Sequence, residues 1–113
     1  MSYYDKNGSP IDRGEFERLS DDRVYVRVGA TELKSAGPPE KHFVVSTVWT
    51  GADTGGREVF ETLVAKNGEN DSEVTKYHTW DEAVEGHNAR VGQCMVELGN
   101  GPKMVREIPA EET

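Results

Sequence analysis

The fold is decided by the stretch His42-Phe43-Val44-Val45-Ser46-Thr47-Val48-Trp49-Thr50. β-Branched and aromatic residues dominate it, and such side chains favour the extended backbone of a strand. Alternate residues of a strand point to opposite faces, and here both faces carry bulky side chains. A strand with bulk on both faces lies inside a sheet. The sequence therefore predicts a central strand over residues 42–50.

A second β-prone stretch, residues 58–66, follows after a short connection. The connection, residues 51–56, contains glycine, aspartate and threonine, which favour turns. A short connection joins antiparallel strands, so we expect residues 42–50 and 58–66 to pair in that way. Another turn follows at Asn67-Gly68, and residues 74–78 are predicted to form a further strand.

The most clearly marked helix begins at Trp80. Thr79 and Glu82 have the Thr-x-x-Glu spacing of a capping box, in which each side chain satisfies a backbone N–H at the helix start. Apolar residues recur at helical spacing through residues 80–98 and form one apolar stripe. Glycine and proline in residues 99–102 indicate where the helix ends.

Two glycines, Gly86 and Gly92, lie inside this predicted helix. A glycine in a helix interior costs about 1 kcal/mol relative to alanine. We therefore expect the backbone to pack closely against another element at these positions.

The N-terminal part of the chain predicts one helix, one strand and one loop. Asp12 and Glu15 are spaced as a capping pair, which predicts a short helix over residues 13–19. Three alternating valines predict a half-buried strand over residues 24–28. Residues 31–41 contain two consecutive prolines, which cannot donate to a strand ladder, and are expected to form a loop.

Together these elements predict an α+β fold. It has an antiparallel sheet of about four strands, one amphipathic helix packed on a face of the sheet, and a short N-terminal helix. A chain of 113 residues fits a single domain. We expect residues 1–10 and 107–113 to be loosely held. The strand over residues 24–28 is the expected sheet edge, the place where another copy would pair, although the oligomeric state is not readable from the sequence.

Composition narrows the classes of partner. The formal net charge of −8 argues against binding of nucleic acid or anionic membranes through a basic face. No apolar run reaches the roughly 20 residues that span a bilayer, so we expect no membrane association. A single cysteine, Cys94, cannot form an intramolecular disulfide and favours a reducing compartment. The first residues lack the apolar core of a signal peptide, and we expect a cytoplasmic protein.

Several short motifs occur in a fixed order, namely Val45-Ser46-Thr47-Val48-Trp49, Phe60-Glu61-Thr62, Glu82-Ala83 and Gly86-His87. This order resembles a family of small uncharacterised proteins from phages of actinobacteria and related bacterial genomes. The relatives have a longer connection between the two strands, with an Asp-His pair and a Gly-Pro-Pro-Leu run. Residues 51–57 have neither. The resemblance implies a phage-type protein of the host cytoplasm and carries no activity.

The connection between the two strands is the first candidate binding site. Its glycines and hydroxyls are of the kind that surround a phosphate, and Trp49 beside it suits stacking on a base; the residues concerned are Trp49, Asp53, Gly55, Gly56 and Arg57. A phosphate loop usually leads into a helix, whereas a strand follows here. An ordinary hairpin turn, with Trp49 closing the core, is therefore the alternative interpretation.

Two histidines form the second candidate. His78 at a strand end and His87 in the helix are expected to meet, together with Glu61 or Asp53. The histidines do not have the spacing of a zinc site, so we expect no metal and no cofactor. His87 and Cys94 are seven residues apart on one helix, about 10 Å along its axis. Because that distance is too long for proton transfer, we predict no catalytic residues.

Three functional hypotheses follow. The first is a small phage-type accessory protein that binds a host or defence protein without catalysis. The second is a protein that binds a small anionic ligand, such as a nucleotide, at the residues named above. The third is an acidic mimic of DNA, in which the mimicking carboxylates are Glu58, Glu61, Glu69, Asp71, Glu73, Asp81, Glu82 and Glu85. The sequence favours binding over catalysis and leaves enzymatic activity open.

Overall fold

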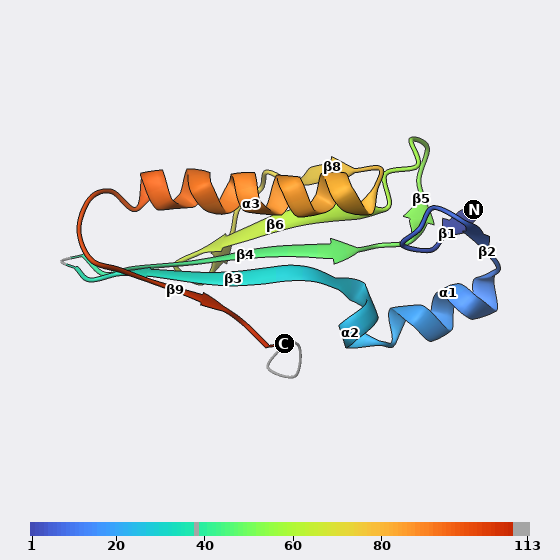
Figure 1. Cartoon of the computed structure of the whole chain (residues 1–113), viewed down its shortest axis with the longest axis horizontal. Coiled ribbons are helices and arrows are strands. Elements are labelled where there is room, and N and C mark those ends of the chain that lie inside the picture. The colour runs from blue at the N-terminus through green and yellow to red at the C-terminus, as the bar shows by residue number, and fades with distance from the viewer. Residues whose placement is uncertain (38, 110–113) are drawn as a thin grey trace.

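A computed structural model describes residues 1–37 and 39–109, which form two β-sheets and three helices (Figure 1). The larger sheet has the strand order β7-β6-β4-β3-β9, with β8 also paired to β6, and the smaller sheet has the order β2-β1-β5. The elements are β1 (Ser2–Tyr4), β2 (Pro10–Ile11), α1 (Arg13–Ser20), α2 (Arg23–Val26), β3 (Arg27–Ser35), β4 (Lys41–Trp49), β5 (Ala52–Asp53), β6 (Phe60–Lys66), β7 (Glu69–Asn70), β8 (Thr75–Tyr77), α3 (Trp80–Glu97) and β9 (Lys103–Glu107).

The pair β4 and β6 forms the middle of the large sheet and confirms the predicted antiparallel arrangement. Val45 lies opposite Val64, and Trp49 lies opposite Phe60. β4 is flanked by β3 and β6, so it is a central strand as its two bulky faces predicted. β8 is the predicted further strand, and it pairs with β6.

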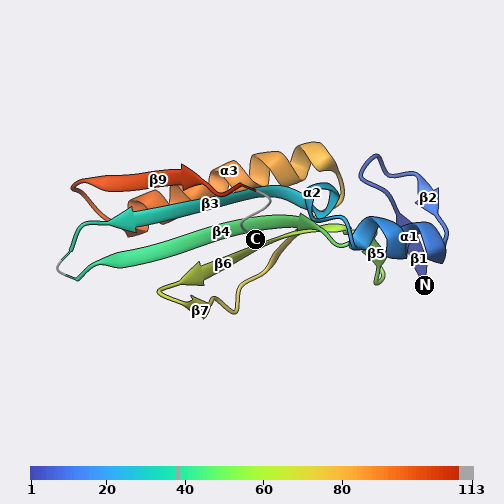
Figure 2. The same ribbon diagram turned by 90° about the horizontal axis from the view of Figure 1, so that it is seen from below.

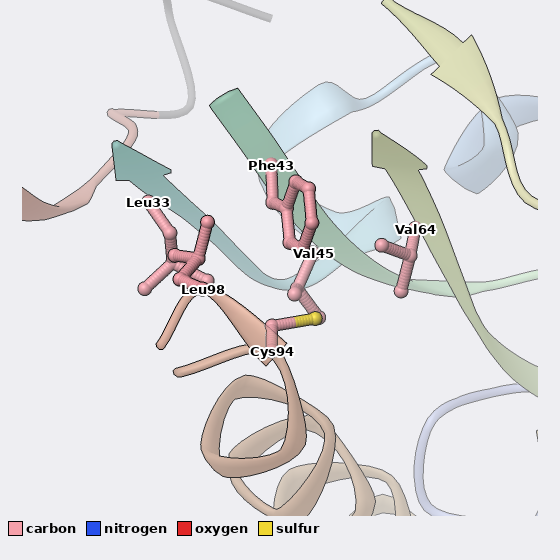
Figure 3. Close-up of a cluster of buried hydrophobic side chains, with 6 residues drawn as sticks. All are labelled: Leu33, Phe43, Val45, Val64, Cys94 and Leu98. Carbon is pink, nitrogen blue, oxygen red and sulfur yellow. The ribbon is translucent and has the colours of Figure 1, made fainter. Parts of the chain in front are cut away.

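Helix α3 lies along one face of the large sheet (Figure 1). The Thr79 hydroxyl accepts the backbone N–H of Glu82 at 3.1 Å, which confirms the predicted N-cap. Side chains from α3 and from three strands meet in a buried cluster, shown in Figure 3, of Leu33, Phe43, Val45, Val64, Cys94 and Leu98. Burial of this cluster is the main force that holds α3 on the sheet.

The prediction for residues 24–35 is wrong over 24–26 and 31–35, whereas Arg27 and Val28 lie in a strand as expected. Val24 and Val26 lie in the short helix α2, because the Asp22 carboxylate accepts the backbone N–H groups of Val24 and Tyr25 and so starts a helical turn. β3 begins only at Arg27 and runs through residues 31–35, which had been expected to form a loop. β3 lies between β4 and β9, so it is not the sheet edge.

The α+β class with a mostly antiparallel sheet is confirmed, but the sheet has more than four strands. β9 extends it beyond β3, and β7 adds a short edge. The N-terminal residues, expected to be loosely held, include β1 and β2, and β1 pairs with β5. At the other end, β9 includes Glu107, and residues 110–113 lie outside the described residues.

A second buried cluster joins the N-terminal segment to the end of the large sheet at which Trp49 lies opposite Phe60. Its members are Leu19, Trp49, Val59, Phe60 and Ala83, with Tyr4, Ile11, Phe16 and Tyr25 among the side chains packed against them. The predicted helix α1 is confirmed, with the Asp12 carboxylate accepting the N–H of Glu15 at 2.8 Å. This cluster packs Tyr4 and Ile11 of the N-terminal segment in the same core as Ala83 near the start of α3.

The opposite face of the large sheet has no described helix along β4 and β6 (Figure 2). Its central side chains are half-buried and mostly apolar; they are Val44, Ser46, Val48, Leu63 and Ala65. We call these five residues the open face. No helix among the described residues is long and apolar enough to cross a membrane.

Candidate functional site

The loop between β5 and β6 is held by one carboxylate. Asp53 accepts the backbone N–H of Gly55 at 2.8 Å and that of Arg57 at 2.9 Å. These two hydrogen bonds to the charged form lower the pKa of Asp53. Arg57 has a φ of +56°, an unusual backbone conformation for a residue other than glycine. Asp53 therefore holds the backbone of Arg57 in a strained conformation, which fixes the position of its Cα and Cβ atoms.

The Arg57 guanidinium lies over the ring of Tyr4, with 4.4 Å between its central carbon and the ring centroid. Pairing of β1 with β5 brings Tyr4 to this position. A cation over an aromatic face is attracted by the ring quadrupole. The ring therefore orients Arg57 and leaves its N–H groups available for an acceptor.

A second cation, Lys6, lies near the start of α3. Its ammonium is 4.7 Å from the ring centroid of Tyr25 and 4.6 Å from that of Trp80, and it donates to the carbonyl of Arg27 at 3.2 Å. Burial lowers the pKa of Lys6, and the nearby Asp22 carboxylate partly opposes this effect. Lys6 is thus a partly desolvated cation held between two aromatic rings.

Lys6 and Arg57 line two hollows that adjoin each other. The hollow at Lys6 has a volume of about 300 Å³, as does the hollow at Arg57. Both are lined by Gly8, His78 and Thr79, so we treat them as one groove, called here the Lys6–Arg57 groove. Its further lining residues are Tyr4, Asn7, Val59, Trp80 and Asp81.

The charge of the groove is mixed. Among the described residues no carboxylate forms a salt bridge with Lys6 or Arg57, although Asp22 acts on Lys6 and Asp53 on Arg57 at longer range. His78 lies between the two hollows, with its Nδ1 3.7 Å from a carboxylate oxygen of Glu82. Asp81 supplies a negative charge at one side. The N-terminus of α3, with its positive end of the helix dipole, faces the same region through Thr79.

The structure brings together Arg57 and His78 of the predicted site, and Asp53, Gly55 and Gly56 shape the loop that carries Arg57. Trp49 is 2% exposed, and its indole N–H donates to the carbonyl of Tyr4 at 2.9 Å. It therefore packs behind the groove as a core residue, which was the alternative interpretation. Sequence reasoning missed Lys6 and Tyr4, because residues 1–10 carry few signals apart from their turn residues.

Glu61 and His87 lie apart from the groove. Glu61 is opposite Val48 and Lys76 in the sheet, and its neighbours Phe60 and Thr62 are buried towards α3, so Glu61 points to the open face. His87 lies in α3, and its side chain is buried between the helix and the sheet. His78 pairs with Glu82 and His87 bonds to threonines, so the expected meeting of the two histidines is not found.

His87 is the centre of a buried row of hydrogen bonds. Its Nε2 lies 2.9 Å from the hydroxyl of Thr31, and its Nδ1 lies 2.7 Å from that of Thr47. Thr31 also bonds to Glu107 at 2.9 Å, and Thr47 to Thr62 at 2.5 Å. Three threonines at buried strand positions were the sequence signal for this row, and it was missed.

The carboxylate of Glu107 sets the direction of every bond in the row. An ionised carboxylate only accepts, so Thr31 donates to Glu107 and accepts from His87 Nε2–H. His87 Nδ1 then accepts from Thr47, which in turn accepts from Thr62. Burial lowers the pKa of His87, with Glu107 opposing this effect and Arg27 adding to it. The row therefore holds a neutral imidazole in one tautomer, and His87 lines none of the described hollows.

No group of three or more metal-ligating side chains occurs within residues 1–37 and 39–109. The predicted acidic surface is interrupted by cations: Asp71 pairs with Lys66 at 3.4 Å and with Arg90 at 3.3 Å. No protein-family model, curated protein or solved structure matches the chain.

Proposed function

We propose that the protein binds a small anionic ligand of the nucleotide type in the Lys6–Arg57 groove and performs no catalysis there. The observation that carries the proposal is a pair of cations without described ion-pair partners in a chain of net charge −8. Several other cations of the chain pair with carboxylates, as Arg18 does with Glu15 and Arg90 with Asp71, whereas Lys6 and Arg57 lie over aromatic rings instead. Two cations that adjoin one groove and lack such partners favour an anion from outside the chain.

The groove also suits the flat ring of a nucleotide. Trp80 is 37% exposed and lines the hollow at Lys6, so part of its ring is available for stacking. Val59 supplies an apolar wall beside Arg57. An arginine fork donates two parallel hydrogen bonds to one phosphate, which fixes orientation as well as charge. Each hollow, at about 300 Å³, lies at the small end of the range for ligand sites.

Replacement of Arg57 by glycine tests this function. Glycine adopts a φ of +56° without strain, so the Arg57→Gly variant removes the guanidinium and keeps the loop. We expect the wild type to bind a nucleotide from a panel of inorganic phosphate, nucleoside monophosphates and cyclic dinucleotides in calorimetric titration. We expect a tenfold or greater rise in Kd for Arg57→Gly, about 1.4 kcal/mol.

The matched control is Asn67→Gly. Asn67 has a φ of +55° and lies in the turn between β6 and β7, away from the groove. This variant relieves the same kind of backbone strain, so its affinity should equal that of the wild type. Equal binding by the wild type and Arg57→Gly, or no heat and no rise in Tm with any panel member, would refute the proposal.

A second candidate is the phage-type accessory role, in which the protein binds a host or defence protein. The open face supports it, because half-buried apolar side chains such as Val44 and Leu63 lie there. Helix α2 borders this face only at its Val48 end, where Val26 and Val48 line one hollow. Exposed apolar area of this kind is typical of interaction surfaces. Substitution of Val48 by glutamate should abolish capture of a partner from host lysate, whereas Arg57→Gly should leave it intact. Failure of the wild type to capture any partner would count against this role.

A further inference from the structure

The backbone of β9 has a defined inner and outer side. The N–H of Ile108 donates to the carbonyl of Ala30, and the N–H of Ala36 donates to the carbonyl of Pro102. In the register of β3 and β9, these bonds place Met104 and Arg106 in the hydrogen-bonded positions towards β3. The N–H and C=O groups of the alternate residues, Lys103, Val105 and Glu107, therefore point away from the sheet.

This outer side is an open sheet edge. β9 is the last strand in the order, and no described strand pairs with its outer side. Residues 103–107 contain no proline and their register with β3 is regular, so neither a proline nor a bulge blocks this edge. The charges of Lys103, Arg106 and Glu107 and the short length of β9 limit pairing to a partner whose charges complement them. Val105 is 51% exposed and Met104 is 41% exposed. The edge thus offers unpaired backbone groups together with apolar side chains.

We propose that β9 pairs with β9 of a second copy of this chain, antiparallel and centred on Val105. In this register every outward backbone group of residues 103–107 finds a partner in the other copy. Val105 lies opposite the Val105 of the second copy, and Lys103 lies opposite its Glu107. The sequence Lys-Met-Val-Arg-Glu is therefore complementary to itself in charge, with an apolar pair at the two-fold axis.

Other registers lose this match. A shift by two residues places Lys103 opposite Val105 and leaves Glu107 without a backbone partner. A shift by one residue sets outward groups against inward ones, so their hydrogen bonds cannot form. The charges of Lys103 and Glu107, together with the outward direction of alternate backbone N–H and C=O groups, select the register centred on Val105.

The side chain of Glu107 is already held in position within a single copy. Its carboxylate oxygens accept the backbone N–H of Ala30 at 3.0 Å and the hydroxyl of Thr31 at 2.9 Å, which fixes the side chain in place. The side chain nevertheless remains 64% exposed. A lysine from the second copy meets a carboxylate that is ordered and still open to solvent, so little conformational entropy is lost there.

Proline substitution at adjacent positions separates pairing with a second copy from folding of β9. The N–H of Val105 points outward, so Val105→Pro removes a donor to the second copy and keeps the bonds to β3. Met104→Pro instead removes a donor to β3. In sedimentation measurements over a wide concentration range, we expect the wild type to dimerise and Val105→Pro to remain monomeric. At a concentration where the wild type is also monomeric, Val105→Pro should have a nearly unchanged Tm and Met104→Pro a lower one. A monomeric wild type, or a dimeric Val105→Pro, would overturn the proposal.

Charge exchange tests the register. Lys103→Glu places two carboxylates opposite each other, and Glu107→Lys places two ammonium groups opposite each other, so each variant alone should weaken the dimer. An equal mixture restores both opposite-charge pairs in a mixed dimer and should recover association. Circular dichroism of each variant checks the fold, since Glu107 also accepts from Ala30 and Thr31 and pairs with Arg27 at 3.9 Å within its own copy. Recovery supports the register, and no recovery from two folded variants refutes it. The dimer is independent of the groove, so Arg57→Gly should dimerise as the wild type does.

Discussion

At the scale of single residues, His87 has the most restricted surroundings. Both of its ring nitrogens bond to threonines, and a further step leads to the carboxylate of Glu107. Gly29 lies against the ring, where an added Cβ would come within 3.1 Å of Nε2. A second proton on the ring, at Nδ1, would require Thr47 and Thr62 to reverse the direction of their hydrogen bonds. A charged His87 is therefore costly in the folded state.

The free energy of unfolding should decrease as the pH falls below the pKa of an unperturbed histidine. The folded pKa of His87 is lowered from 6.5, so the unfolded chain binds the proton first on acidification. Between 6.5 and the lower folded value, the free energy of unfolding should decrease by at most about 1.4 kcal/mol per pH unit. Urea unfolding at pH 7.5 and 5.5 measures this, before most carboxylates titrate. The decrease should disappear in His87→Gln, and an equal decrease in that variant would contradict the assignment.

At the scale of whole elements, the two glycines of α3 have different surroundings. Gly86 lies against Tyr77 of β8, where an added Cβ would come within 2.2 Å of the ring, whereas nothing lies within 4 Å of such an atom at Gly92. The predicted close packing is thus confirmed at Gly86 and wrong at Gly92. The helical pattern alone could not distinguish the two, because the difference depends on where β8 crosses the helix.

Alanine at these two positions should have opposite effects. Gly86→Ala should destabilise the protein by about 1–3 kcal/mol, since the tyrosine ring or the helix must move. Gly92→Ala should stabilise it by roughly 1 kcal/mol, because alanine is the better helix former and meets open space. The midpoints of thermal or urea unfolding give both values. The same sign for both variants would contradict the packing of α3 described above.

At the scale of the whole molecule, Trp49 connects the N-terminal sheet to the large sheet. Its ring lies in the cluster that includes Phe16 and Tyr25, with the two ring centroids 5.8 Å and 5.0 Å from its own. Its indole N–H reaches the carbonyl of Tyr4 in β1. The molecule measures 50 × 27 × 22 Å, and this cluster lies at one end of the strands, away from the cluster around Val45.

The two tryptophans should respond differently to replacement by phenylalanine. Trp49→Phe leaves the carbonyl of Tyr4 without its donor and shrinks a buried side chain, so we expect a loss of about 2–4 kcal/mol. Hydrogen exchange at Tyr4, whose N–H bonds to Gly51, should rise with it. Trp80→Phe, at a partly exposed position, should cost less than about 1 kcal/mol. Similar losses in both variants would show that Trp49 does not couple the two sheets.

The sequence by itself determined the elements whose signals are local: the two-faced strand β4, its antiparallel partner β6, and the capped helices α1 and α3. It also predicted Arg57 and His78 as site residues, and the structure places both along the Lys6–Arg57 groove. Tertiary structure decided the rest, because those features depend on contacts between distant residues. Asp22 turned a run of valines into α2, β9 completed the sheet and placed Glu107 at Thr31, and the pairing of β1 with β5 brought Tyr4 to Arg57. No local pattern specifies which distant strand a segment will pair with, and the Lys6–Arg57 groove exists only after that pairing.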